Sequence, residues 1–146
     1  MKKLLQHWKI IQVEETILLI DGDDESRIAV KHILEINGFR VVEACHGIEA
    51  LQILGTFGEA IQLALCSEDL PDMTAGQWRG QMRFMGPEIP SIILSDKEKS
   101  EIVNLPLGTL QGSTTLKSLL ITKILEKIRR ELDEEFFKAR RLASVA

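Results

Sequence analysis

The feature that most constrains this chain is a regular alternation of short apolar runs with longer amphipathic stretches. Runs rich in leucine and β-branched residues occur at 16–21 (TILLID), 39–44 (FRVVEA), 61–66 (IQLALC) and 90–95 (PSIILS). A stretch with helical periodicity follows each of them. Strands that alternate with helices in this way form a parallel sheet through right-handed crossovers. We therefore expect an α/β three-layer sandwich with about five strands.

Cap residues mark where the expected helices begin and end. The first helix covers residues 26–37, with Asp23 or Asp24 as its N-cap and an Asn-Gly pair as its stop. The second covers residues 47–57, and Thr74 can cap a third helix. The apolar face of this third helix is expected to consist of Trp78, Met82 and Met85.

The last third of the chain is less regular. Residues 97–106 predict one or two helical turns, and a short extended piece near 108–111 (GTLQ) follows as the expected fifth strand. From Thr114 onward apolar residues recur every four positions, which predicts one helix that runs past Arg130 to about Leu142. At ~1.5 Å per residue this helix is longer than such a domain can cover. Its free end should pack on a second copy in a homodimer, or else form a solvated tail.

A chain of 146 residues has room for one domain with a real core. We expect an N-terminal leader (1–15), a core domain (16–128) and a C-terminal helical extension (129–146). The leader contains Trp8 among other apolar residues, which is compatible with an extra docked helix or with a disordered segment.

Charge, hydropathy and cysteine use exclude several functional classes. Lys and Arg number 18 against 22 Asp and Glu, so the net charge of −4 offers no basic face for nucleic acid. No apolar run approaches the ~20 residues of a membrane span. Cys45 and Cys66 lie in apolar stretches without metal-ligand spacing, and we expect both to be reduced core thiols of a cytoplasmic protein.

Sites in open parallel sheets form beyond the carboxyl ends of strands, where the strand order reverses. The loops after Ile20, Cys66 and Leu94 are therefore the places to look. There the chain resembles the receiver domains of two-component response regulators, which have a flavodoxin-like fold. The resemblance rests on residues 17–54 (ILLIDGDDESRIAVKHILEINGFRVVEACHGIEALQIL) and 69–73 (DLPDM), and it covers roughly residues 16–128.

The resemblance implies a phosphoryl transfer from a histidine kinase to an aspartate four residues before the proline of DLPDM. Here that acceptor position is Ser67. Family members also hold Mg²⁺ with two consecutive acids at the end of the first strand, where this chain has Asp21 and Gly22. The resemblance therefore implies that the phospho-acceptor is substituted and that the metal site beside it has lost one of its two acids.

Further family positions differ as well. A lysine at the end of the fifth strand is replaced by Gln111 or Gly112. The Thr/Ser switch position is kept as Ser95, but the small residue expected after it is Asp96. The resemblance thus implies a remnant acidic pocket whose positions are Asp21, Gly22, Ser95, Asp96 and Gly112.

These replacements have chemical consequences that do not depend on the family. A serine hydroxyl is a poor nucleophile unless a base lies within hydrogen-bond reach. Mg²⁺ prefers several oxygen ligands, so Asp21 alone should bind it weakly or not at all. Asp96 adds negative charge where a phosphate oxygen would sit. Because two acids and a lysine are lost together, the change in the net charge of the pocket is partly compensated. Since the remaining ligands are poor, we expect no bound cofactor.

We therefore expect a degenerate receiver domain, a non-enzymatic signalling module that binds a protein partner without aspartyl phosphorylation. One alternative is an active phosphorelay receiver with an unusual acceptor, Ser67 or Asp69. Another is a haloacid-dehalogenase-like phosphotransferase that uses Asp21, because residues 21–23 match its DxD motif although its other residues are not evident. The acids of residues 21–25 are expected to cap a helix in preference to binding a cation.

Overall fold

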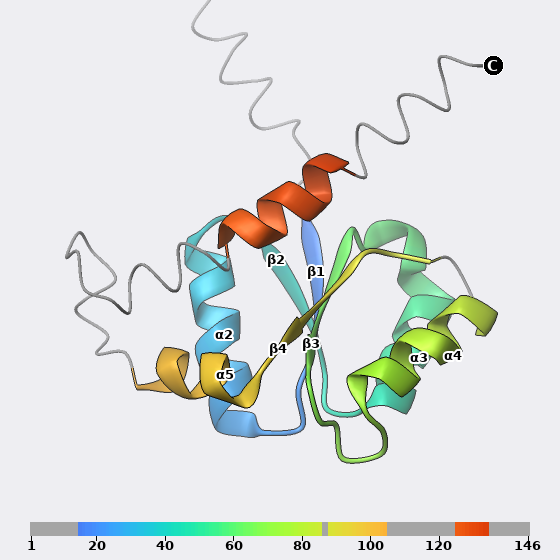
Figure 1. Ribbon diagram of the computed structural model, residues 1–146. Helices are drawn as coiled ribbons and strands as arrows, with labels where there is room; N and C mark the ends of the chain where they lie inside the picture. Colours follow the sequence, from blue (N-terminus) through green and yellow to red (C-terminus); the bar gives the residue numbers. More distant parts are fainter. Residues whose placement is uncertain (1–14, 86–87, 105–124, 135–146) are drawn as a thin grey trace, which may run out of the picture.

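A computed structural model describes residues 15–85, 88–104 and 125–134. Within these ranges the chain forms one parallel four-stranded sheet with the strand order β2-β1-β3-β4 (Figure 1). The fifth strand expected at 108–111 lies outside the described residues. The strands are β1 (Thr16–Ile20), β2 (Arg40–Ala44), β3 (Leu63–Ser67) and β4 (Ser91–Leu94).

The two central strands fix where a site can form. Every residue of β1 and β3 is buried, as expected for parallel strands that are covered on both faces. From β1 the chain first moves outward to β2 and then returns to β3 on the other side of β1. The strand order therefore reverses between β1 and β3. Asp21 directly follows the carboxyl end of β1, and Ser67 is the last residue of β3.

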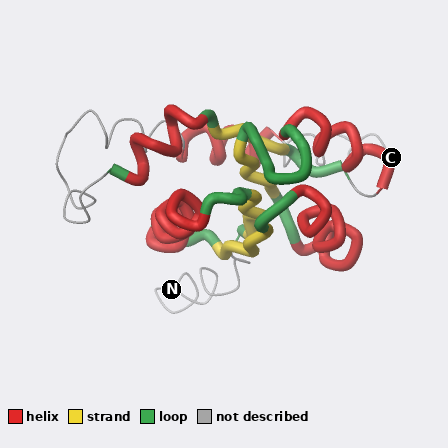
Figure 2. Tube along the Cα trace, turned by 90° about the horizontal axis from the view of Figure 1, so that it is seen from below, coloured by secondary structure: helices red, strands yellow, loops and turns green. Residues whose placement is uncertain are grey.

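Helices cover both faces of the sheet, which confirms the three-layer α/β sandwich (Figures 1 and 2). On one face lie α2 (Asp24–Ile36), α5 (Asp96–Val103) and the C-terminal helical segment, residues 125–134. On the other face lie α3 (Gly47–Phe57) and α4 (Ala75–Met85), with a 3₁₀ turn at Gly58–Ala60 after α3. Each face has its own apolar core cluster against the sheet.

Local sequence signals explain the helix ends. The Asp23 side chain accepts a hydrogen bond from the Ser26 amide and is the N-cap of α2, while Asn37 is its C-cap. Gly38 follows with φ of 89°, a left-handed conformation that favours glycine. Thr74 Oγ1 accepts a hydrogen bond from the Gln77 amide at the start of α4, so both predicted caps are confirmed.

Two predicted core positions are wrong. Trp78 and Met82 are buried, but Met85, the last residue of α4, is 66% exposed. Cys66 is buried, whereas Cys45 is exposed in the loop after β2. Among the described residues, no helix is both long and apolar enough to cross a membrane.

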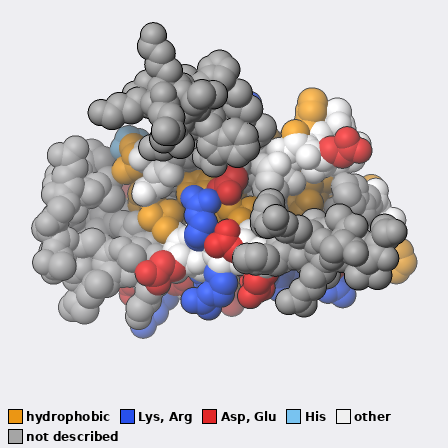
Figure 3. All heavy atoms as spheres, turned by 90° about the horizontal axis from the view of Figure 1, so that it is seen from above, with side chains coloured by type: hydrophobic (Ala, Val, Ile, Leu, Met, Phe, Trp, Pro, Cys, Tyr) orange, Lys and Arg blue, Asp and Glu red, His pale blue; other side chains and the backbone are white. Residues whose placement is uncertain are grey.

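The C-terminal helical segment packs near the amino ends of the strands. Ile128 and Leu132 are buried in the α2-side core, and its exposed positions are charged residues. Arg129 pairs with Glu15 at 2.8 Å and lies over the Phe39 ring, at an end of the molecule where charges of both signs gather (Figure 3). The boundary expected after residue 128 falls within this segment, and the rest of the expected 114–142 helix lies outside the described residues.

Candidate functional site at the carboxyl edge of the sheet

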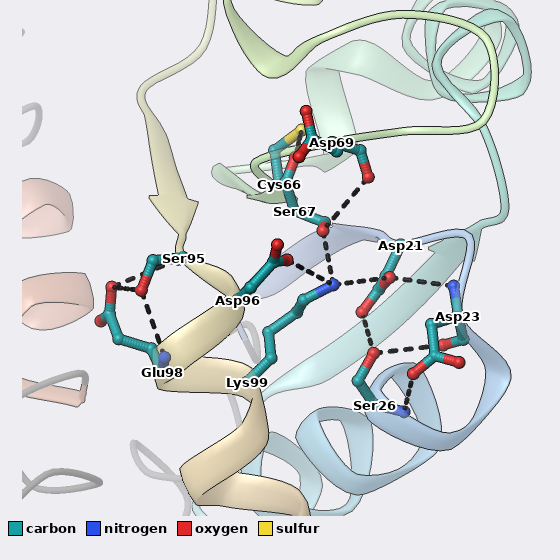
Figure 4. A network of polar contacts seen from close by, with 10 residues as sticks. All are labelled: Asp21, Asp23, Ser26, Cys66, Ser67, Asp69, Ser95, Asp96, Glu98 and Lys99. Carbon is teal, nitrogen blue, oxygen red and sulfur yellow. Dashed lines mark hydrogen bonds and ion pairs between the residues drawn. The ribbon is translucent and has the colours of Figure 1, made fainter.

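Asp21, the first residue after β1, is held in place by hydrogen bonds on every side. Its amide donates to the Ala44 carbonyl at 3.0 Å, which keeps it in line with the sheet. One carboxylate oxygen accepts hydrogen bonds from the Ser26 hydroxyl, and the other accepts from the Asp23 amide at 3.0 Å. The Lys99 ammonium lies 3.3 Å from this second oxygen (Figure 4). The carboxylate is therefore already satisfied by groups of this chain.

Lys99 joins the ends of the two central strands. Its Nζ donates to Ser67 Oγ at 2.7 Å as well as contacting Asp21, and its third neighbour is the Asp96 carboxylate at 3.7 Å. The side chains of Lys99 and Asp21 are 12% and 3% exposed, so this is a nearly buried ion pair. Its geometry defines the central feature of the site, which we call the Asp21–Lys99–Ser67 cluster.

Lys99 was not predicted from the sequence, although a local signal for its position exists. Ser95 is the N-cap of α5, and Ser95 and Glu98 form a reciprocal capping box that fixes the first turn of the helix. Side chains on a helix lean toward its N-terminus, and the N-terminus of α5 is at the carboxyl edge of the sheet. A long side chain at position 99 therefore reaches back into the site.

The positions predicted around the pocket separate in the structure. The Ser95 hydroxyl contacts Glu98 at 3.0 Å as part of the cap and lies away from Ser67 (Figure 4). Asp96 stands at the rim with 72% of its side chain exposed. Asp21 and Ser67 do come together, through Lys99. Gln111 and Gly112 lie outside the described residues.

Gly22, at the second acid position of the family, has no room for a side chain. A Cβ built there would lie 2.5 Å from Pro71 Cγ and 3.2 Å from the Cys45 carbonyl oxygen. Atoms at such distances must shift apart. The proline of the β3–α4 loop therefore packs into the space that a second metal-binding carboxylate would need.

The rest of the β3–α4 loop is tied to the start of α3. Asp72 accepts hydrogen bonds from the amides of Gly47 and Ile48 at 2.8 and 3.0 Å, and Met73 fills the space over Gly47. Desolvation raises the pKa of Asp72, but the two amide hydrogen bonds outweigh it, so this pKa lies below its ordinary value of 3.8. The carboxylate of Asp72 thus holds the β3–α4 loop against the start of α3.

The acids that follow Asp21 are engaged elsewhere. The amide of Ser26 lowers the pKa of the capping Asp23, and Asp24 pairs with Arg27 at 2.6 Å. Within the described ranges, no group of three or more His, Cys, Asp or Glu side chains is placed to hold a metal ion. Both oxygens of Asp21 already accept hydrogen bonds from groups of this chain, one of them from the Lys99 ammonium, so a cation bound at Asp21 would compete with these contacts.

Other nucleophiles near the site are either buried or turned outward. Burial raises the pKa of the Cys66 thiol to about 12, so it stays protonated and inert at neutral pH. Glu68 and Asp69 follow the end of β3 and are exposed, and Asp69 presents its carbonyl rather than its carboxylate to Ser67.

No protein-family model matches the chain. The sensor kinase CckA of Brucella abortus is 29% identical over 119 residues, 77% of this chain and 13% of that protein. A cyclic di-GMP phosphodiesterase of Thermotoga maritima is 27% identical over 88 residues, 60% of this chain and 23% of that protein. The chain thus spans less than a quarter of either relative.

Solved structures with this fold include a response-regulator receiver domain from Clostridium thermocellum, with a TM-score of 0.60, 20% identity, and 84% and 98% of the two chains covered. A CheY-like receiver domain from Methanospirillum hungatei gives a TM-score of 0.58 at 24% identity, covering 84% and 99%. The receiver domain of the hybrid histidine kinase CckA gives 0.54 at 20% identity, covering 80% and 98%. The chain has the flavodoxin-like fold of a response-regulator receiver domain, as its sequence resemblance implied.

Proposed function

We propose that this chain is a degenerate receiver domain, which acts in signal transduction as a protein-interaction module and is not phosphorylated on aspartate. One observation supports this above all: the nearly buried Lys99 ammonium bridges Asp21 and Ser67, at 3.3 and 2.7 Å. It occupies the space between the ends of β1 and β3, so neither a divalent cation nor a phosphoryl group has a free set of ligands there.

The charge balance favours this closed arrangement. The sequence alone leaves Asp21 without a counter-ion, but Lys99 supplies one from α5 and makes the pair neutral. A buried charge with a partner and complete hydrogen bonds is far less costly than an unpaired one. A Mg²⁺ ion would have to displace Lys99 and would gain only one carboxylate in exchange.

An active phosphorelay receiver with an unusual acceptor is the main alternative. For Ser67 to attack, a neighbouring base must take its proton, yet its close neighbour Lys99 donates to it and is paired with Asp21. Asp69 is exposed, and no cation lies beside it among the described groups that could offset a phosphate. Both acceptors therefore lack the surroundings that a transfer needs.

A haloacid-dehalogenase-like phosphotransferase would need Asp21 as its nucleophile. Both oxygens of Asp21 accept hydrogen bonds from this chain, and Asp23, the second acid of the DxD motif, caps α2. Neither carboxylate is free to attack a phosphate or to act as a proton donor. We accordingly propose a non-enzymatic, cytoplasmic role.

The proposed partner is another signalling protein rather than a small molecule. The relatives are a sensor kinase and a cyclic di-GMP phosphodiesterase, and the chain matches a minor part of each. A module of that kind acts through contacts with neighbouring domains or proteins. A homodimer through the C-terminal helix remains part of the proposal, but the described segment 125–134 exposes only charged positions, so an apolar dimer seam would have to lie outside it.

Intact-mass measurement after incubation with acetyl phosphate and Mg²⁺ tests the proposal. A receiver domain with a complete acid pocket serves as the positive control for the reagent. We expect no magnesium-dependent gain of a phosphoryl group by this chain. A gain that disappears in Ser67→Ala or in Asp69→Asn would instead establish the phosphorelay alternative and identify its acceptor.

A further inference from the structure

The short helix α5 lies on the same face of the sheet as α2 and packs against it. Ile102 is the one buried residue among its eight, and it packs in the core cluster that also contains Val30 and Ile33 of α2. Lys99 lies three residues before Ile102, so both side chains project from one face of the helix. The helix therefore has an apolar anchor and a polar anchor, one turn apart.

The polar anchor is unusual because its partners belong to the sheet. Lys99 reaches Asp21 after β1 and Ser67 at the end of β3, residues that are 78 and 32 positions away in sequence. The capping box of Ser95 and Glu98, in contrast, is internal to the start of the helix and fixes nothing beyond it. An isolated helix of eight residues is not stable in water, so α5 depends on its tertiary contacts.

We infer that Lys99 is a positioning residue that latches α5 to the carboxyl edge of the sheet through Asp21 and Ser67. This inference rests on the proposed function: a domain that receives no phosphoryl group must fix its interaction surface with its own contacts. The ammonium of Lys99 ties α5 to the ends of β1 and β3 from within the chain. The exposed surface of α5 is consequently presented to a partner in one state.

Amide hydrogen exchange of the full chain, without kinase or partner, tests the latch. In Lys99→Gln we expect exchange of the amides of residues 100–103 to be accelerated at least tenfold more than exchange of the α3 amides, which reports only the loss of global stability. Lys97→Gln removes the same charge from an exposed position of the same helix and should leave α5 unchanged. Ser67→Ala removes the 2.7 Å contact but keeps the Asp21 pair, so it should accelerate exchange in α5 about threefold.

If Lys99→Gln does not fold, Ser67→Ala still tests whether Lys99 holds α5 in place. Unchanged exchange in α5, or an equal acceleration in α3 and α5, would overturn the latch, since Lys99 would then contribute nothing or only global stability. Because no phosphoryl donor is present, the result is independent of the acetyl phosphate experiment. If the parent chain gained a phosphoryl group and α5 still exchanged faster in Lys99→Gln, the proposed function would be refuted while the role of Lys99 in holding α5 would stand.

Discussion

The two edges of the sheet use charged residues in opposite ways. At the carboxyl edge, Asp21 and Lys99 form an ion pair that is almost fully withdrawn from solvent. At the amino edge, Arg129 and Glu15 form a shorter pair whose side chains are 52% and 33% exposed. Exposed pairs contribute little to stability, whereas removing one partner of a buried pair leaves an uncompensated charge. Burial rather than distance therefore decides which pair the fold depends on.

The two edges also differ in the residues that line them. A pocket of about 600 Å³ near the amino ends of the strands is lined by acidic side chains and by apolar residues, including Ile61 and Pro90. At the carboxyl edge, Pro71 lies against Gly22, and Lys99 lies between Asp21 and Ser67. Lys99 thus lies at the edge where open parallel sheets usually bind ligands.

The largest effect is expected from breaking the buried pair. Asp21→Asn leaves the Lys99 ammonium without its carboxylate and should lower the free energy of unfolding by about 3 kcal/mol. The double variant Asp21→Asn with Lys99→Met should lose less than the sum of the two single variants, because no unpaired charge remains. Urea unfolding measures both, with Glu15→Gln at the amino edge as the matched control. If Asp21→Asn lowered the free energy of unfolding no more than Glu15→Gln does, the contrast between the two edges would be wrong.

A smaller effect is expected from a methyl group at Gly22. Gly22→Ala places a Cβ against Pro71 and should cost about 1–3 kcal/mol, because the loop must move away. Gly80→Ala is the matched control: a Cβ meets nothing within 4 Å there, and alanine favours the helix by up to ~1 kcal/mol. Thermal unfolding should therefore shift in opposite directions for the two variants. A Gly22→Ala protein as stable as the parent would show that the loop does not seal this position.

The loop anchor Asp72 should give a pH-dependent effect. Its pKa is lowered on folding from an ordinary value of 3.8, so its contribution is complete above that value and is lost as pH falls through the lower folded pKa. Asp72→Asn should be less stable than the parent by about 1 kcal/mol at pH 7. The difference should shrink as unfolding is measured at successively lower pH below 4. A constant difference across this range would exclude the charged form of Asp72 as its source.

The smallest effect is expected at the amino edge. Arg129→Ala removes an exposed ion pair and a contact with the Phe39 ring, and should cost about 0.5–1 kcal/mol. Because exposed pairs are screened, added salt should narrow the gap between the variant and the parent. A loss comparable to that of Asp21→Asn would remove the distinction between the edges.

Local signals in the sequence were sufficient for most of the fold. The apolar runs, the cap at Asp23 and the stop at Gly38 depend on neighbouring residues, and the corresponding elements are confirmed. Met85 and Cys45 were assigned wrongly because periodicity does not tell how far the buried part of a helix or strand extends: Met85 is the last residue of α4, and Cys45 follows the end of β2. Such limits are set by packing between distant segments.

The site was predictable only in part, for the same reason. The family resemblance identified Asp21, Gly22 and Ser67 as positions of interest, and the structure brings Asp21 and Ser67 into one cluster. The family resemblance did not indicate Lys99, because this lysine lies in α5, whereas the family's lysine lies at the end of the fifth strand. The capping box of α5 is a local signal for the direction of the Lys99 side chain, but its contacts with Asp21 and Ser67 also require that α5 lies beside α2, which is a tertiary arrangement.

The central claim is that the carboxyl edge no longer accepts a divalent cation and a phosphoryl group. ¹⁹F NMR of the full chain with Mg²⁺ and beryllofluoride tests this most directly, since a receiver site that binds both gives a resonance distinct from those of the free species. We predict only the free species. A protein-bound resonance that requires Mg²⁺ and disappears in Asp21→Asn would contradict the account.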